Sequence, residues 1–316
     1  MARRKSTANK NLLFHEYFIE WVETYKEGHV RQVTLNKYLV THKQLELLAP
    51  RLLLSEMTRR DYQKIINDYA LTHERQTTMD FHHQVKAAVQ DAFHDGLLDR
   101  DASYKAVIKG RKPKPKKQKF LSNSELKKLI ATLDLSKDVN VGWDWFILFL
   151  AKTGVRFAEG LAITPNDFDL KKNTLTVNKT WEYKLSSKNT FAPTKNQSSV
   201  REIVLDWQII GQLVPKIMHL PPDEPIFVDP DKRIHNSIVN TFLRNKCIEA
   251  GVTVVTVHAL RHTHASVLMA SGISMHSISQ RLGHSNVTTT QEIYAHVIDE
   301  LKEKDDNLMM QALSGL

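Results

Sequence analysis

The stretch KGRKPKPKKQK, residues 109–119, decides how the chain is organised. Seven of its eleven residues are Lys or Arg, and two are prolines. Proline interrupts helices and favours extended backbone, and so high a density of positive charge repels itself unless it is solvated or neutralised by an anion. The stretch therefore predicts an extended basic linker between two folded parts, residues 1–108 and 120–316. A solvated hinge without a binding role is the alternative interpretation.

The residues before the linker have a helical period throughout. Aromatic side chains recur at spacings of four, three and four on one face: Phe14, Phe18, Trp21 and Tyr25. Further helices are predicted from near Thr34, after a capping box formed by Thr58 and Asp61, and over residues 78–94. We expect a small all-helical bundle over residues 1–108, with these aromatics in its core and no catalytic residues.

A second domain begins after the linker, where Ser122 and Glu125 form a capping box that opens a new helix. The apolar stretch WDWFILFLAKTG predicts a buried helix that ends at Gly154. Two alternating stretches rich in β-branched residues each predict a strand: residues 174–183 and 199–205. Helices follow from about Ser237 to the end. The predicted fold class is mainly α with a small antiparallel β-sheet (α+β).

Composition limits what the chain does. Its 316 residues are 41% hydrophobic, which is enough for a sizeable core, and no apolar run approaches the ~20 residues of a membrane span. The basic N-terminus runs into the amphipathic LLFHEYFIEWV and not into the apolar region of a signal peptide, so we expect no export and no membrane. The lone Cys247 excludes an internal disulfide and predicts a reducing compartment, the cytoplasm. A formal charge of +9 suggests an anionic partner such as nucleic acid.

The stretch TVHALRHTHASVLMASG, residues 256–272, predicts a helix capped by Thr256 and ended by Gly272. His258 and Arg261 are three residues apart, so they share a face near the end of the helix where backbone N–H groups favour an anion. His264 lies on the opposite, mostly apolar stripe. We therefore expect it to be a core histidine with its hydrogen bonds satisfied.

A second arginine, Arg156, follows the glycine that ends the buried helix, and Glu159 comes three residues later. An arginine at a helix start is again close to an anion-favouring end. Taken alone, the pair is better explained as a surface Arg–Glu pair of little energetic value.

The stretch QRLGHSNVTTTQEIYAH contains the remaining candidates. Gly283 is expected to end a short helix, with His284 in the turn that follows. Thr289 and Glu292 then predict the cap of another helix, which carries Tyr294.

Five elements stand in a fixed order along the chain: R in TGVRFAEG, K in PTKNQSSVREIVL, H-x-x-R in HALRHTHAS, L-G-H in LGHSNVTTT and Y in IYAHV. This ordered set resembles the tyrosine recombinase, or phage integrase, family, and most of all integrases of temperate phages and conjugative transposons. The resemblance covers the region from about residue 120 to the end. The helical bundle with its basic linker is similar to the core-binding domain that such enzymes carry in front.

The resemblance implies six catalytic residues: Arg156, Lys195, His258, Arg261, His284 and Tyr294. The two arginines would hold the non-bridging oxygens of the scissile phosphate, and the lysine would protonate the leaving 5′ oxygen. The histidines would bind the phosphate and transfer protons, and the tyrosine would attack. Physical chemistry agrees, since the planar, permanently charged guanidinium suits phosphate, and a phenol with a pKa of about 10 needs a nearby base or a cationic field to become a nucleophile. Neither a metal nor another cofactor is expected.

The implied partners are double-stranded DNA with inverted core half-sites, three further copies of the chain in a synaptic homotetramer, and directionality or host DNA-bending factors. The implied location is the nucleoid in the cytoplasm of a bacterial host. The expected phosphate contacts of the linker come from six residues: Arg111, Lys112, Lys114, Lys116, Lys117 and Lys119.

Three alternatives stay open at this point. His258, His262 and His264 are close enough in sequence for a metal site, but Arg261 between them would repel a cation and no HExxH-type carboxylate accompanies them. A non-catalytic DNA-binding protein would explain the linker but not Tyr294 beside arginines and histidines. A type IB topoisomerase uses much the same chemistry without partner protomers.

The tail HVIDELKEKDDNLMMQALSGL continues past the expected nucleophile. Its last apolar group is too short to fold alone and must bury its face somewhere: Leu308, Met309, Met310 and Leu313. Packing against its own domain is one outcome. The family resemblance favours the other, docking on a neighbouring protomer.

Overall fold

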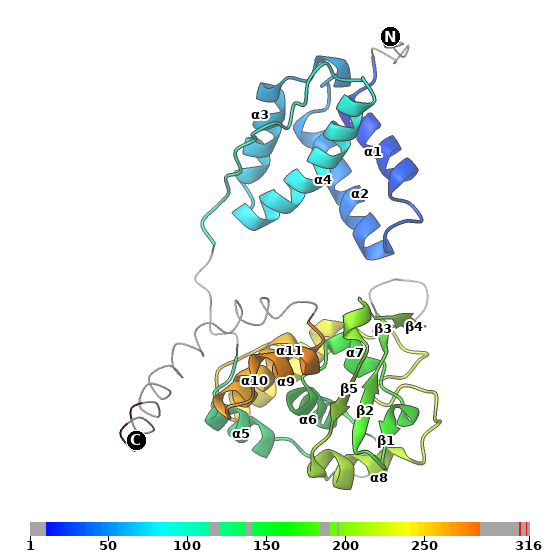
Figure 1. The fold of residues 1–316 in the computed structure, drawn as a ribbon, viewed down its shortest axis with the longest axis vertical. Coiled ribbons are helices and arrows are strands. Elements are labelled where there is room, and N and C mark those ends of the chain that lie inside the picture. The colour runs from blue at the N-terminus through cyan, green and yellow to red at the C-terminus, as the bar shows by residue number, and fades with distance from the viewer. Residues whose placement is uncertain are drawn as a thin grey trace. The chain divides into compact units, whose positions relative to one another are not determined.

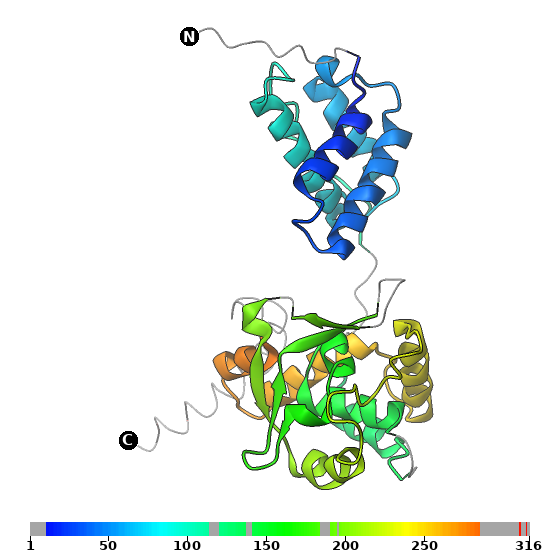
Figure 2. The ribbon, with the colours of Figure 1, turned by 90° about the vertical axis from the view of Figure 1, so that its right-hand side faces the viewer.

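The computed structural model describes residues 11–113, 120–136, 141–183, 190–194 and 196–284, together with Met310 and Ser314. The chain separates into two compact units, Met1–Lys116 and Lys117–Leu316. Figure 1 and the turned view in Figure 2 show helices in the first unit and helices with a small sheet in the second. None of the described helices is both long and apolar enough to cross a membrane.

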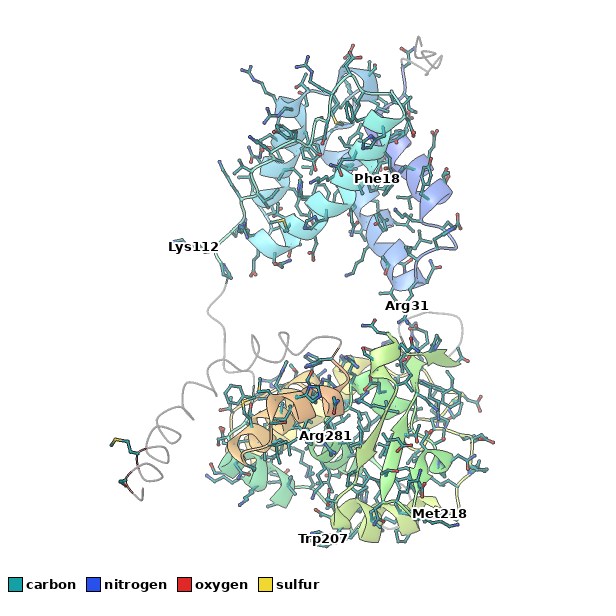
Figure 3. All side chains as sticks on the ribbon, in the orientation of Figure 1. Phe18, Arg31, Lys112, Trp207, Met218 and Arg281 are labelled. Carbon is teal, nitrogen blue, oxygen red and sulfur yellow. The ribbon has the colours of Figure 1, made fainter. Side chains whose placement is uncertain are left out.

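In its described part, the N-terminal unit consists of the helices α1 (Phe14–Tyr25), α2 (Gln32–Leu48), α3 (Arg59–Ala70) and α4 (Arg75–His94), with the short 3-10 helix η1 (Leu54–Glu56). The aromatic face predicted for α1 is the core. Phe14 and Phe18 are fully buried, Trp21 is 2% exposed, and Figure 3 shows Phe18 lying among the helices. Trp21 also donates a hydrogen bond of 2.7 Å from its indole nitrogen to Asp91 on α4. The expected bundle with buried aromatics is confirmed, except that Tyr25 is half exposed.

Helix starts follow the predicted chemistry where a capping box is present. Thr58 and Asp61 exchange the reciprocal hydrogen bonds that open α3. Without such a signal the expected starts are wrong by two or three residues, since α2 begins at Gln32 and α4 at Arg75. Both of these helices lack a side-chain hydrogen bond at the N-cap.

The described helices of the C-terminal unit begin with α5 (Asn123–Ala131), α6 (Trp143–Thr153) and α7 (Phe157–Leu161), and continue with α8 (Val214–Ile217), α9 (Asn236–Glu249), α10 (Val257–Ala270) and α11 (Met275–Leu282). Short helical turns are η2 (Pro165–Asp167), η3 (Gln197–Ser199) and the π-helical η4 (Ile209–Leu213). Helix α6 is buried on every side from Trp145 to Ala151, as its apolar sequence predicts, and packs along α10.

The described strands form two small antiparallel sheets. One has the order β1 (Phe168–Asp169), β2 (Thr174–Val177) and β5 (Arg201–Val204), and the other pairs β3 (Lys179–Glu182) with β4 (Thr190–Pro193). The single strand expected over residues 174–183 is therefore wrong: it breaks at Asn178 into β2 and β3, which join different sheets. The fold class, mainly α with a small antiparallel sheet, is confirmed.

Candidate active site

Arg156 is placed by the end of α6. Gly154 ends that helix with φ of +67°, and a Cβ there would lie 2.5 Å from the ring of His264, so glycine is required. The chain then turns, and Arg156 becomes the N-cap residue of α7. Its Nη1 donates to Glu159 Oε1 at 2.6 Å and its Nη2 to the carbonyl of Gly283 at 2.9 Å.

The Arg156–Glu159 pair is not the surface pair that the sequence alone favours. The Glu159 side chain is 1% exposed, and its second carboxylate oxygen accepts a hydrogen bond of 2.9 Å from Arg201 on β5. Burial raises the pKa of Glu159, but Arg201 and then Arg156 outweigh burial, and the pKa lies below its usual range. The carboxylate is therefore ionised and fixes two guanidinium groups.

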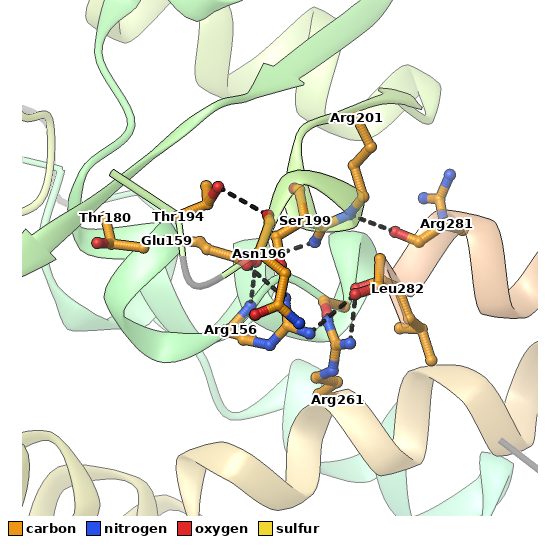
Figure 4. Close-up of polar contacts among 12 residues, drawn as sticks. Arg156, Glu159, Thr180, Thr194, Asn196, Ser199, Arg201, Arg261, Arg281 and Leu282 are labelled. Carbon is orange, nitrogen blue, oxygen red and sulfur yellow. Dashed lines mark hydrogen bonds and ion pairs between the residues drawn. The ribbon is translucent and has the colours of Figure 1, made fainter. Parts of the chain in front are cut away.

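Arg261 lies on the second turn of α10 and is 4% exposed. Its Nη1 donates to the carbonyl of Gly154 at 2.8 Å, and its Nη2 to the carbonyl of Leu282 at 2.6 Å. These bonds join α10 to the end of α6 and to the end of α11. Arg156 and Arg261 thus meet at the same turn, because they bind the neighbouring carbonyls of Gly283 and Leu282 (Figure 4).

His284 follows that turn. Gly283 ends α11 with φ of +67°, as the sequence predicts, and a Cβ there would lie 3.0 Å from the carbonyl oxygen of Ser198. Burial, together with Arg261 and Arg156, lowers the pKa of His284 to about 4. The imidazole is therefore neutral at physiological pH, which leaves one ring nitrogen as a donor and one as an acceptor.

The remaining histidines of α10 have separate environments. His258 is exposed in the first turn, two residues after the N-cap Thr256, and its ring lies edge-on to that of His262 at 4.9 Å between centroids. His264 is buried, with Nδ1 2.9 Å from the carbonyl of Ala151 and Nε2 accepting from Arg281 Nε at 2.9 Å. The expectation of a satisfied core histidine is confirmed.

This arrangement removes His264 from the alternative interpretation, in which His258, His262 and His264 together bind a metal ion. Both ring nitrogens of His264 are engaged within the protein, so His264 cannot join His258 and His262 around a cation. In the described ranges, no cluster of three or more His, Cys, Asp or Glu side chains has a geometry that would hold a metal ion.

Sequence reasoning missed two arginines of the site. Arg201 donates from Nε to the carbonyl of Arg281 at 2.6 Å, and its Nη1 donates to the carbonyl of Ser199 at 2.8 Å. Arg281 itself reaches back to α10, β5 and α6. Alternation along β5 places Arg201 on the same face as the buried Ile203, and an arginine on the apolar face of a strand is the signal that identifies it.

Several predicted residues lie outside the described residues: Lys195, Tyr294, Lys114, Lys116, Lys117 and Lys119. The chain on both sides of Lys195 is described. Strand β4 ends at Pro193, and Thr194 Oγ1 donates to the carbonyl of Asn196 at 3.1 Å. Arg111 and Lys112 are exposed, and Arg111 Nε donates to the carbonyl of Leu71 at 2.6 Å, which ties the start of the linker to the N-terminal unit.

The site concentrates positive charge around a single turn. The guanidinium groups of Arg156, Arg201 and Arg261 converge on the end of α11, and the carboxylate of Glu159 binds two of them (Figure 4). Guanidinium groups bind phosphate through paired N–H donors and stay charged at every physiological pH. The geometry therefore suits an anion of the phosphodiester type, held beside a neutral imidazole.

Comparisons with known proteins place the chain in a family. The model of the phage integrase family matches residues 119–300. The chain is 26% identical to an integrase of Staphylococcus phage L54a over 97% of the chain and 96% of the relative. It is also 26% identical to the ICEBs1 integrase of Bacillus subtilis (strain 168), over 61% of the chain and 56% of the relative.

Solved structures show the same fold. The Tn1549 transposon integrase in complex with transposon right end DNA has a TM-score of 0.74 at 17% identity, over 94% of this chain and 100% of that one. A lambda integrase dimer bound to a core site has a TM-score of 0.64 at 16% identity, over 89% of this chain and 77% of that one. The family match spans more than half of the chain. The chain therefore belongs to the phage integrase family and is a site-specific tyrosine recombinase, which breaks and rejoins DNA to integrate or excise a phage or another mobile element.

Proposed function

We propose that Arg156 and Arg261 hold the two non-bridging oxygens of the scissile phosphate while Tyr294 attacks the phosphorus. The observation that carries this proposal is the convergence of both guanidinium groups on the carbonyls of Gly283 and Leu282. In the transition state, negative charge builds on the equatorial oxygens, and fixed arginines stabilise it without reorganisation. The Arg156 side chain is accessible to DNA, because 30% of it is exposed.

The proposed reaction exchanges one phosphate ester for another. The Tyr294 hydroxyl loses its proton to a histidine of the site as its oxygen forms a bond to phosphorus. The bond from phosphorus to the 5′ oxygen breaks, and Lys195 gives a proton to the departing 5′ oxygen. The product is a 3′-phosphotyrosine and a free 5′ hydroxyl. The new ester conserves the energy of the old one, so rejoining needs neither ATP nor another cofactor.

His284 and His258 have proton-transfer and phosphate-binding roles in this proposal. The neutral state of His284 supports it, because a neutral imidazole both donates and accepts a hydrogen bond. Burial lowers the pKa of His284 most, and the positive charges of Arg261 and Arg156 lower it further; a phosphate between the arginines would offset only this second contribution. Binding of DNA would therefore bring this histidine closer to the pH at which it exchanges protons.

We further propose that the protein acts as a homotetramer on double-stranded DNA with inverted core half-sites, in the cytoplasm of a bacterial host. Directionality or host DNA-bending factors are further proposed partners. Residues 1–108 would serve as a core-binding domain and residues 120–316 as the catalytic domain. The linker would follow the phosphates through Arg111, Lys112, Lys114, Lys116, Lys117 and Lys119.

The test of the nucleophile is Tyr294→Phe on a nicked suicide substrate, on which a cleaved complex cannot rejoin. The variant should bind the half-site as the wild type does but form no denaturant-resistant protein–DNA adduct. An adduct with the Phe variant would refute the assignment. A chelator should leave wild-type cleavage unchanged, and a chelator-sensitive reaction would revive the metal alternative.

Product topology separates recombination from topoisomerase-like relaxation. A substrate with two full sites should yield exchanged DNA ends, whereas a supercoiled plasmid with a single site should not be relaxed continuously. A protein that only binds DNA would give neither product.

A further inference from the structure

Three consecutive carbonyl groups at the end of α11 are each held by a different arginine. The contacts are Arg201 Nε to the Arg281 oxygen (2.6 Å), Arg261 Nη2 to the Leu282 oxygen (2.6 Å) and Arg156 Nη2 to the Gly283 oxygen (2.9 Å). The last carbonyls of a helix have no partner within the helix, and cations near them are favoured. The end of α11 therefore serves as the common support of these three guanidinium groups.

The two proposed phosphate ligands depend on this support. The Arg261 fork spans from the carbonyl of Gly154 to that of Leu282, so a shift of α11 would move one of its two ends. Arg156 is held by Glu159 on one side and by Gly283 on the other. Whatever fixes α11 therefore also fixes the angle at which these forks meet a phosphate.

Arg281 ties α11 to three other elements through its own side chain. Its Nε donates to His264 Nε2 at 2.9 Å, its Nη1 to the carbonyl of Val204 at 3.0 Å and its Nη2 to the carbonyl of Lys152 at 3.2 Å. One side chain thus joins α11 to α10, to the end of β5 and to the last turn of α6. An eight-residue helix is marginal alone, and the apolar cluster beneath α11 is small: Ala265, Met269, Ile278 and Leu282.

The bond from Arg281 to His264 requires a particular state of the imidazole. Because His264 Nδ1 faces the carbonyl of Ala151, that nitrogen carries the hydrogen, and Nε2 is left as the acceptor. Burial, and then Arg281, lower the pKa of His264 to about 3. The ring therefore stays neutral and keeps this acceptor at any pH at which the protein works.

We infer that Arg281 is a positioning residue for DNA cleavage: by holding α11 against His264, Val204 and Lys152, it aligns Arg156 and Arg261 on the scissile phosphate. This inference rests on the proposed roles of Arg156 and Arg261. Arg281 acts through its neighbours and not by touching DNA.

The test compares two suicide substrates, one with the normal scissile phosphate and one with a methylphosphonate at the same position. The methyl group replaces a charged non-bridging oxygen, so the neutral substrate gains less from aligned arginines. On the normal phosphate, Arg281→Gln should lower the single-turnover cleavage rate roughly 10- to 100-fold, as a misaligned site does, with half-site affinity unchanged. On the methylphosphonate the loss should be several times smaller.

Two variants of His264 test the same hydrogen bond by changing its acceptor. His264→Leu removes the acceptor and should reproduce the phosphate-specific loss, whereas His264→Gln offers an amide oxygen to Arg281 and should recover most of the rate. These variants keep the inference testable if Arg281→Gln does not fold. The matched control is His276→Ala, an exposed residue of α11 that contacts Gln280, and it should cleave both substrates like the wild type.

Equal losses on both substrates for Arg281→Gln and His264→Leu would mean general damage to the fold and would overturn the inference. The proposed function has its own control in Arg156→Ala, which removes a proposed phosphate ligand directly. If Arg156→Ala also lowers the cleavage rates of both substrates equally, the proposed binding of the phosphate by Arg156 and Arg261 is wrong. The inference about Arg281 is then wrong as well.

Discussion

The guanidinium of Arg201 lies 2.9 Å from the carboxylate of Glu159, and both side chains are almost completely buried, with exposed fractions of 6% and 1%. A buried ion pair is costly to desolvate and is retained where both charges also meet other partners. Here Glu159 binds Arg156 as well, while Arg201 binds the end of α11. The pair therefore links the proposed catalytic arginine to the helix that supports it.

Removing the charge of Glu159 should destabilise the protein strongly. Glu159→Gln would leave two guanidinium groups without their carboxylate, and breaking a buried pair in this way costs about 3–5 kcal/mol. The measurement is urea unfolding of the full chain. Lys172→Gln serves as the control, because Lys172 pairs with Asp169 at 3.7 Å on the surface and should leave the midpoint nearly unchanged. Similar midpoint shifts for the two variants would contradict a structural role for the buried pair.

Acid should weaken the N-terminal unit through His82. Burial, and then His83 and Lys86, lower the pKa of His82 to about 4, while its Nδ1 lies 2.8 Å from the Tyr62 hydroxyl. The folded protein thus binds fewer protons than the unfolded chain between pH ~6.5 and about 4. The stability due to neutral His82 is complete above that range and falls as the pH falls through it, by up to about 1.4 kcal/mol per pH unit.

The measurement for His82 is the free energy of unfolding against pH. His82→Gln keeps a polar partner for Tyr62 but does not titrate, so its curve should be flatter than that of the wild type below pH ~6.5. His94→Gln alters an exposed histidine at the end of α4 and should keep the wild-type slope. Parallel curves for wild type and His82→Gln would show that other groups carry the acid sensitivity.

Local sequence signals predicted most of the fold. The reciprocal hydrogen bonds of Thr58 with Asp61 and of Ser122 with Glu125 are short-range, so they can be identified from spacing alone, and both helices begin where predicted. The glycines that end α6 and α11 were likewise identified, because a left-handed residue after a helix favours glycine. The helical spacing of the apolar residues then predicted which face of a helix is buried in the core.

What could not be predicted depends on contacts between distant segments. The alternation of apolar and polar residues continues through β2 and β3, but the two strands pair with different partners and are separated at Asn178. The arginines of the site bind carbonyl groups of Gly154, Leu282 and Gly283, and a carbonyl has no sequence signature. Arg281 could not be singled out for the same reason, since two of its three partners are backbone oxygens.

The basic linker makes a prediction about salt. Each neutralised phosphate contributes about 0.9 to the slope of log affinity against log salt concentration. Replacing Lys112, Lys114, Lys116 and Lys117 with Gln should flatten the slope by about 2–4 units and weaken binding to all sequences similarly. The measurement is a half-site titration at several salt concentrations. An unchanged slope would mean that the linker is only a solvated hinge.

The tail prediction has a candidate acceptor on the described surface. A groove of about 430 Å³ lies between β5 and the helices α10 and α11, and its apolar lining includes Val204, Leu268 and Ile273. Val204 and Ile273 are 66% and 44% exposed. In the tail, Met310 is described and is 71% exposed. Five of the eight residues that line the groove are polar or charged, and its three apolar side chains offer a candidate contact for the apolar residues of a neighbouring copy's tail.

We expect that deleting residues from Asp305 onward leaves half-site binding intact but removes cooperative binding to a full site and abolishes strand exchange. The physical reason is that a single protomer on a half-site has no neighbour to receive its tail, whereas protomers on a full site do. Gel-shift titrations on half and full sites, with a recombination assay, measure both effects. Ile273→Lys places a charge in the groove and should reproduce the deletion, whereas Lys172→Gln, a surface change at a residue that does not line the groove, should not. If the deletion instead loses half-site binding or lowers the melting temperature of the free protein, the tail packs on its own domain, and docking between copies is ruled out.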